Sequence, residues 1–263
     1  MKPSKLAPLC GVLLLAVASC GCSKLKARDH LNKGVAAYKN AQFQAAIEHF
    51  KEAVADDPSL LMAKLYLATA LKQLYIPEGD SPANVKIGKQ AIEAFEEVLK
   101  EDPNNDTALA SIAQTYYQMH DFDKAKEYQR RRLQVDPNNA EPYFWIGAID
   151  WALAYRDNAA KRQELKLNVP NAQGELPPLP AKAREELTQK IGPLVDEGLK
   201  ALLKELDLKP NDSDAMGYVN LMYRQKADLE ADADARQADL KQAGQFFDKS
   251  LALRKAAAEK ASK

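Results

Sequence analysis

The side chains best suited to chemistry in this chain are three cysteines and three histidines. Cys10, Cys20 and Cys22 all lie near the N-terminus, and no cysteine follows from residue 23 onward. A thiol can be acylated, oxidised or bound to a metal, but disulfides and thiolate ligands cannot hold the body of this protein together. The body must therefore be stabilised by packing alone.

The rest of the chain offers no recognisable catalytic set. His30, His49 and His120 fall at unrelated points of the helical pattern, so we expect them to share no face. The sequence holds no H-E-x-x-H pair, no Gly-rich phosphate loop and no G-x-S-x-G turn. Its carboxylates follow polar helix faces that solvent would cover. The sequence predicts no catalytic residue, no metal site, no cofactor and no enzymatic activity.

Composition narrows the class of protein. The chain has 263 residues, of which 46% are hydrophobic and 28% charged, which excludes a body embedded in a membrane. Lys plus Arg and Asp plus Glu both number 37, so no basic excess indicates a nucleic-acid partner. The length exceeds one typical domain, but an elongated repeat array could use all of it as one unit.

The N-terminus has the layout of a secretory signal. Lys2 and Lys5 precede the apolar stretch 9–17, which is well short of the ~20 residues that span a bilayer. The sequence Val17-Ala18-Ser19-Cys20 resembles a lipobox, the bacterial lipoprotein motif that ends at a cysteine. The resemblance implies a signal peptide over 1–19, cleavage after Ser19 and lipidation of Cys20, with residues 20–26 as the tether.

Two or more acyl chains would make this tether durable. By the sorting rule of such lipoproteins, Gly21 favours the outer membrane, with the body facing the periplasm. Two alternatives stay open. The chain could be a secreted protein with incidental cysteines, or Cys22 could carry the lipid, although Ser19 is a poor residue three places before it.

Proline-containing dipeptides mark a repeat. Pro58, Pro103, Pro137 and Pro210 each follow an amphipathic helical run, at separations of 45, 34 and 73 residues. The pattern resembles the tetratricopeptide repeat (TPR), a 34-residue helical hairpin with small residues at positions 8, 20 and 27, an aromatic near 24 and Pro at 32. The first repeat matches at Gly34, Ala46, Phe50, Ala53 and Pro58, and later repeats match at Ala68, Ala91, Phe95, Ala113, Ala125 and Gly147 and, in a weaker fifth copy, at Asn220, Ala243, Phe247 and Ser250. Tyr128 stands one place early, Arg132 occupies a usually small position, and Gly198 and Leu202 replace the alanine and the aromatic of repeat four.

The resemblance implies an all-α solenoid of about five hairpins over 27–255. The repeats cover about 27–60, 61–105, 106–139, 140–212 and 213–255, and a polar tail follows at 256–263. Physical reasoning agrees, because Ile47, Phe50 and Val54 recur at helical spacing and form one apolar stripe. Proline stops the second helix, since it lacks an N–H and disfavours helix in the residue before it.

Three insertions fall between the two helices of a repeat. Repeat two gains about 11 residues, with a turn at 76–79 and an N-cap at Ser81-Pro82 that begins a helix over 82–101. Repeat four gains about 39 residues, including the proline-rich loop 168–180 between helical runs 156–167 and 181–190. The stretch 228–237 of repeat five reads as helix extended into solvent. We favour a partner-specific arm over a plain spacer for 156–190.

In TPR proteins the first helices line a concave face, and the resemblance implies that these positions bind a protein or peptide partner here. The residues carried over are Leu31, Val35, Tyr38, Lys39, Leu65, Thr69, Lys72, Gln73, Gln114, Tyr117, Gln118, Phe144, Ala148, Trp151, Leu221, Arg224 and Gln225. Alternatively, Tyr38 and Trp151 pack against the inserted hairpins. The chaperone-tail clamp of some TPR proteins needs Lys and Asn where Leu31 and Val35 stand, so that function is not supported.

The expected function is therefore a membrane-tethered scaffold for protein–protein interaction in envelope or outer-membrane assembly. The membrane would be reached through the lipid only, with no nucleic acid and no small-molecule substrate. The alternative is a structural adaptor for a wall, pilus or secretion component that uses the insertion at 156–190.

Overall fold

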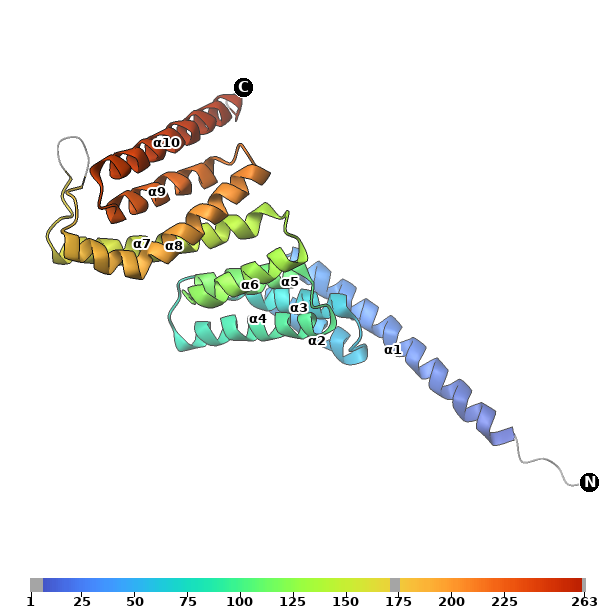
Figure 1. Ribbon diagram of the computed structural model, residues 1–263. Helices are drawn as coiled ribbons and strands as arrows, with labels where there is room; N and C mark the ends of the chain where they lie inside the picture. The colour runs from blue at the N-terminus through green and yellow to red at the C-terminus, as the bar shows by residue number, and fades with distance from the viewer. Residues whose placement is uncertain (1–6, 171–175, 262–263) are drawn as a thin grey trace, which may run out of the picture. The chain divides into compact units, whose positions relative to one another are not determined.

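The computed structural model describes residues 7–170 and 176–261, with side chains from residue 22 onward, and these residues form ten α-helices and no strand (Figure 1). The expected all-α fold is confirmed. The side chains of the expected signal peptide over 1–19, Cys10 among them, and that of Cys20 lie outside the described side chains, and residues 23–26 of the expected tether are helical. The helices are α1 (Ala7–Lys39), α2 (Phe43–Asp56), α3 (Leu61–Gln73), α4 (Pro82–Glu101), α5 (Asp106–Gln118), α6 (Phe122–Val135), α7 (Ala140–Glu164), α8 (Ala181–Leu208), α9 (Ser213–Leu229) and α10 (Ala233–Ala261).

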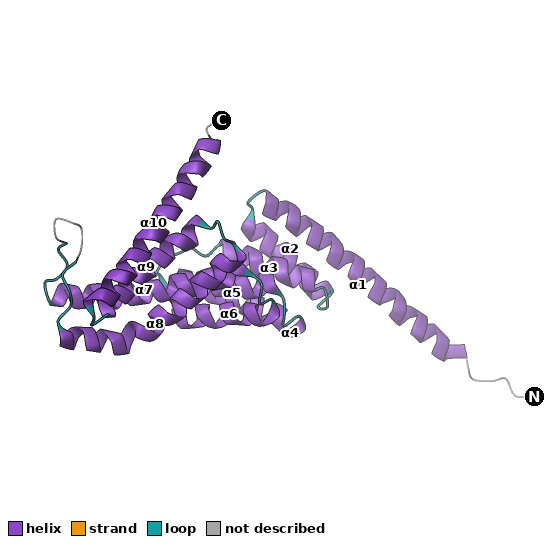
Figure 2. Cartoon of the chain, turned by 45° about the horizontal axis from the view of Figure 1, so that its top comes forward, coloured by secondary structure: helices purple, strands orange, loops and turns teal. Residues whose placement is uncertain are grey.

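The chain divides into two compact units, residues 1–128 and 129–263. In the first unit the helices α1, α2, α3, α4 and α5 pack consecutively, and α3 also contacts α1 and α5. In the second unit α7 to α10 pack consecutively, and α7 also contacts α9. Figure 2 shows the short loops that join the helices into hairpins. Stacked hairpins with neighbouring first helices are the arrangement of a TPR-type solenoid.

Side-chain caps fix where several helices begin. The Ser81 hydroxyl accepts a hydrogen bond from the backbone N–H of Asn84, with Pro82 at the first helical position, so the predicted start of α4 is confirmed. The Asn84 side chain in turn donates to the carbonyl oxygens of Ile76 and Gly79, which holds the inserted turn closed. Asn105, Asn139 and Asp212 cap α5, α7 and α9 in the same way.

Small residues at the repeat positions let paired helices approach closely. A Cβ on Gly34 of α1 would lie 2.5 Å from Cε1 of Phe50 on α2, so a larger residue there would clash with the ring. Ala46, Phe50 and Ala53 are fully buried around this contact. The same relation recurs in the second unit, where a Cβ on Gly147 of α7 would clash with Leu202 of α8. In the TPR pattern, a small residue on the first helix of a hairpin thus faces a large side chain on the second helix.

The fifth repeat departs from the expected match at one position. Phe247 was expected to fill the aromatic site, but its side chain is 51% exposed. Instead Phe246 packs against the core and stacks on Tyr223, with ring centroids 6.0 Å apart. The prediction for Phe247 is wrong by one residue, because the face of α10 that packs on the core carries Phe246 and not Phe247.

The insertion of repeat four extends both helices of its hairpin and then folds back. Leu179 is buried in the core of the second unit, and the partly buried Leu165 and Leu167 pack against that core. The Arg162 guanidinium donates to the carbonyl oxygens of Leu167 and Pro177, which holds both described ends of the loop. Residues 171–175 lie outside the described part. The described residues of 156–190 are therefore packed structure.

The stretch 228–237 is also not a solvent-extended helix. Helix α9 ends at Leu229 and α10 begins at Ala233, so a turn interrupts the stretch. Asp228 pairs with Arg162, at 2.6 Å between Oδ1 and Nη2, and its side chain is 12% exposed. The prediction was wrong because an acidic, alanine-rich sequence does not reveal a buried cationic partner far away in the chain.

Candidate partner-binding surfaces

The first helices of the N-terminal unit bring the predicted groove residues of α1, α3 and α5 together. The amide of Gln73 donates to the hydroxyl of Tyr38 at 3.0 Å, which joins α3 to α1. The Lys72 ammonium donates to the amide oxygen of Gln114, which joins α3 to α5. The predicted positions therefore lie on one continuous face of this unit.

Apolar side chains form the base of this face, and polar groups lie at its surface. Leu31, Val35 and Tyr38 pack against the core beneath it and are half-buried, as Leu65, Thr69, Lys72, Tyr117 and Gln118 are. Lys39, Gln73 and Gln114 are exposed. Tyr38 also meets Phe43 edge-on, with centroids 5.3 Å apart, so part of its ring is used in packing. Amide and hydroxyl groups that hydrogen-bond each other across helices can exchange those bonds for ones to a peptide backbone.

Lys72 has an unusual electrostatic setting on this face. Burial lowers the pKa of its ammonium group below the ordinary value, because desolvation disfavours the charged form. Its hydrogen bond to Gln114 satisfies one donor, but an amide oxygen supplies no counter-charge. A carboxylate from a partner would supply that charge, which makes Lys72 the groove residue with the most to gain from an acidic ligand.

The predicted groove residues of the C-terminal unit are less available. Ala148 and Gln225 are buried, at 3% and 8% exposure. Phe144 and Trp151 both pack edge-on against Tyr218 within the core, with centroid separations of 5.4 Å. Leu221 is half-buried, and Arg224 is exposed and donates to Asn220. In this unit Phe144 and Trp151 mainly pack α7 against Tyr218 of α9, and not against an inserted hairpin.

The indole of Trp151 nevertheless has a polar group that other described residues do not satisfy. Its indole N–H has no hydrogen-bond partner among the described residues. A buried Trp usually finds such a partner, so this donor is the one feature of the aromatic cluster that a ligand could use.

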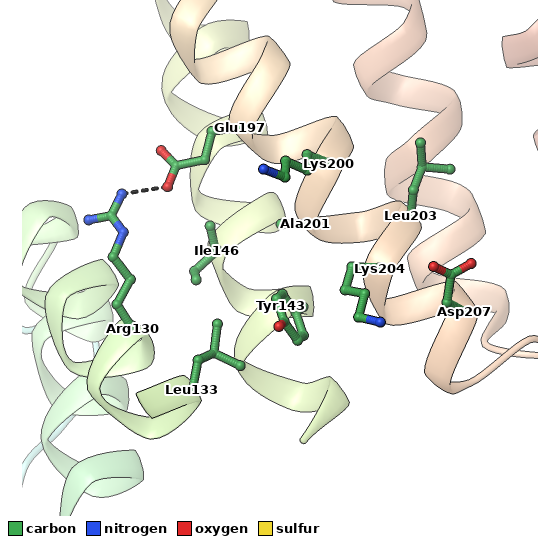
Figure 3. A pocket seen from close by; sticks show the side chains of 10 residues that line it. All are labelled: Arg130, Leu133, Tyr143, Ile146, Glu197, Lys200, Ala201, Leu203, Lys204 and Asp207. Atoms are coloured by element: carbon green, nitrogen blue, oxygen red, sulfur yellow. Dashed lines mark hydrogen bonds and ion pairs between the residues drawn. The ribbon is translucent and has the colours of Figure 1, made fainter. Parts of the chain in front are cut away.

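A surface cavity of about 840 Å³ lies in the C-terminal unit beside α8 (Figure 3). Its floor is apolar and its rim charged, with Arg130 paired to Glu197 on one side. Its other lining residues are Leu133, Tyr143, Ile146, Lys200, Ala201, Leu203, Lys204 and Asp207. Sequence reasoning missed it because the TPR resemblance directs attention to first helices. Exposed Leu203, which lies off the buried stripe of Leu199 and Leu202, was the available signal.

The expectation that the histidines share no face is wrong for two of them. His30 of α1 and His49 of α2 lie with ring centroids 6.1 Å apart, and both ring Nδ1 atoms approach Glu52. Counting positions along one repeat hid this, because the residues belong to two antiparallel helices that face each other. His120 takes no part in this cluster and packs edge-on against Phe122.

Comparisons with known proteins agree with the fold. Residues 88–145 match the tetratricopeptide repeat family. Interferon-induced protein with tetratricopeptide repeats 2 from Cricetulus griseus is 32% identical over 106 residues, which are 40% of this chain and 20% of that protein. The chain thus spans about a fifth of the length of this relative.

Two solved structures share the architecture over most of their length. A crystal structure of MamA protein is 14% identical, covers 89% of this chain and 94% of its own, and has a TM-score of 0.58. YrrB, a TPR protein with an unusual peptide-binding site, is 14% identical, covers 86% and 90%, and has a TM-score of 0.50. The fold of this chain is therefore an all-α TPR-type solenoid.

Proposed function

We propose that this chain is a protein-interaction scaffold that binds a peptide or protein segment on the first-helix face of its N-terminal unit. Two cross-helix hydrogen bonds carry the proposal, Gln73 to Tyr38 and Lys72 to Gln114. They join the first helices α1, α3 and α5 into one face whose surface is polar and aromatic. The similarity to YrrB, which has a peptide-binding site, supports this class of partner.

The chemistry of the face favours an extended segment with an acidic residue. Partly desolvated Lys72 has no charged partner among the described residues, and the neighbouring amide and hydroxyl groups suit backbone hydrogen bonds. Half-buried Leu31, Val35 and Leu65 give apolar contacts for alternate side chains. Phe144 and Trp151 contribute less, because they pack against Tyr218.

The proposal includes a lipid tether. The lipobox resemblance at Val17 to Cys20 supports anchoring through Cys20, and Gly21 supports the outer membrane with the body facing the periplasm. Among the described residues no helix is long and apolar enough to cross a membrane. A role in envelope or outer-membrane assembly follows from this placement.

Site-specific photo-cross-linking in cells tests the binding face. A photoreactive residue at Gln73 or Gln114 should give the same partner adduct, because both side chains are exposed on the proposed face. Exposed Glu97 on the second helix α4 is the matched control and should give no such adduct. An adduct obtained equally from Glu97, or from none of the three positions, would refute the proposed face.

A further inference from the structure

We infer that His30, His49 and Glu52 form a binding site for a divalent first-row transition-metal ion on the first hairpin. Nδ1 of His30 lies 2.7 Å from Oε2 of Glu52, and Nδ1 of His49 lies 3.2 Å from the same oxygen. One potential ligand atom from each residue lies within 4.8 Å of the other two. The three donors thus converge on a volume that one ion can fill.

The sequence positions these donors through ordinary helix geometry. His49 and Glu52 are three residues apart on α2, a spacing that puts both side chains on one helix face. His30 reaches them from α1, which is held close to α2 by fully buried Ala27 and Ala53. Because the hairpin core fixes both backbones, little conformational entropy remains to be lost when an ion binds.

The donor set selects the class of ion. Two imidazole nitrogens and one carboxylate oxygen suit Zn²⁺, Co²⁺, Ni²⁺ or Fe²⁺, whereas Ca²⁺ and Mg²⁺ prefer oxygen ligands only. Tetrahedral Zn²⁺ with bonds of about 2.0–2.1 Å places its ligand atoms about 3.3 Å apart. Two of the observed separations, 2.7 and 3.2 Å, lie close to this value, and the third lies within 4.8 Å, so side-chain rotation could bring all three donors onto one ion.

The surroundings fit a three-ligand site. Nε2 of His30 faces Oδ2 of Asp56 at 3.8 Å, so a carboxylate lies behind this ring, as it commonly does behind a ligating imidazole. The His49 and Glu52 side chains are 36% and 54% exposed, so water can reach the fourth coordination position. The ion would join α1 to α2 independently of the proposed binding face.

Metal titration of the untagged full chain in mild detergent tests this site. Substitutions Cys10→Ser, Cys20→Ser and Cys22→Ser remove the thiols that would compete. Co²⁺ serves as the probe, because its visible absorption reports an ordered nitrogen and oxygen ligand set, and Zn²⁺ should displace it. One Co²⁺ per chain is expected, together with a Zn²⁺-dependent rise in melting temperature.

Variants assign the ligands. His30→Gln, His49→Gln and Glu52→Gln should each weaken binding by about tenfold or more, since each removes a ligand of the site. His120→Asn is the matched control, because His120 lies outside the cluster and its φ of 59° is one that Asn tolerates. Circular dichroism checks that each variant is helical.

A measurement on the chain with its three histidines intact keeps the test decisive if a variant fails to fold. Because the chain has only these three histidines, each ring NMR signal can be assigned. Zn²⁺ should shift the signals of His30 and His49 but leave those of His120 unchanged. Absence of stoichiometric uptake, equal affinity in the His30→Gln and His120→Asn variants, or a shift of His120 alone would each overturn the inference.

Discussion

Arg162 of α7 and Asp228 of α9 form a two-point ion pair inside the C-terminal unit. The distance is 2.6 Å from Nη2 to Oδ1 and 3.1 Å from Nε to Oδ2, and Asn158 also donates to this carboxylate at 2.8 Å. The two side chains are 3% and 12% exposed. The pair ties the insertion of repeat four to the following hairpin, because the same guanidinium holds the loop carbonyls.

Removing one member of this pair should destabilise the C-terminal unit strongly. We expect Asp228→Ala to lower the free energy of unfolding by about 3–5 kcal/mol, since it leaves a buried guanidinium without its charge partner. Urea denaturation followed by circular dichroism measures the change. Arg254→Ala is the control: its pair with Asp214 is exposed, so it should cost less than about 1 kcal/mol. Equal effects would show that the buried pair is not special.

Glu205 should make the stability of the same unit depend on pH. Burial, followed by the negative charge of Asp212, raises its pKa to about 7 from the ordinary 4.5. The folded state therefore holds this proton more tightly than the unfolded chain does. The contribution is fully present below about pH 4.5 and is lost as pH rises through about 7.

The Glu205→Gln variant removes this titration while keeping the shape of the side chain. The wild-type protein should lose on the order of 3 kcal/mol between pH 4.5 and 8 that the variant does not lose. Urea unfolding at several pH values compares the two. Parallel pH profiles would show that Glu205 is ionised in the folded protein at neutral pH.

Cys20 should decide where the protein resides in a bacterial cell. Cys20→Ala removes the thiol that the lipobox resemblance assigns to acylation, so we expect the variant to leave the membrane fraction. Cys22→Ala is the matched control and should stay membrane-bound. Immunoblots of washed membranes and soluble fractions report the result, and retention of the Cys20→Ala variant after carbonate washing would rule out the tether.

Local signals in the sequence predicted much of the fold. Gly34 and Phe50 announce a helix pair with close axes, and the structure shows the two in contact. Ser81 and Pro82 announce a helix start, which the structure confirms. Such features can be predicted from sequence because the conformational or steric preference of a single residue decides the local structure.

Features that depend on two residues far apart in the chain could not be predicted from the sequence. Asp228 looked like a solvated acid because Arg162 lies 66 positions earlier in the chain. His30 and His49 meet only once α1 and α2 pair, and Phe144 and Trp151 meet Tyr218 only once α7 packs on α9. Their side-chain types allowed several environments, and tertiary packing chose among them.

The Gly147–Leu202 contact has a consequence for how such chains change over time. It sits in the hairpin that gained the most residues, yet it has the same form as the Gly34–Phe50 contact of the uninterrupted first repeat. Growth at the far end of a hairpin therefore leaves the close contact between the two helices at its base unchanged. A lineage can lengthen one hairpin while keeping the pairing of its two helices, provided that the added residues find partners of their own, as Arg162 does in Asp228.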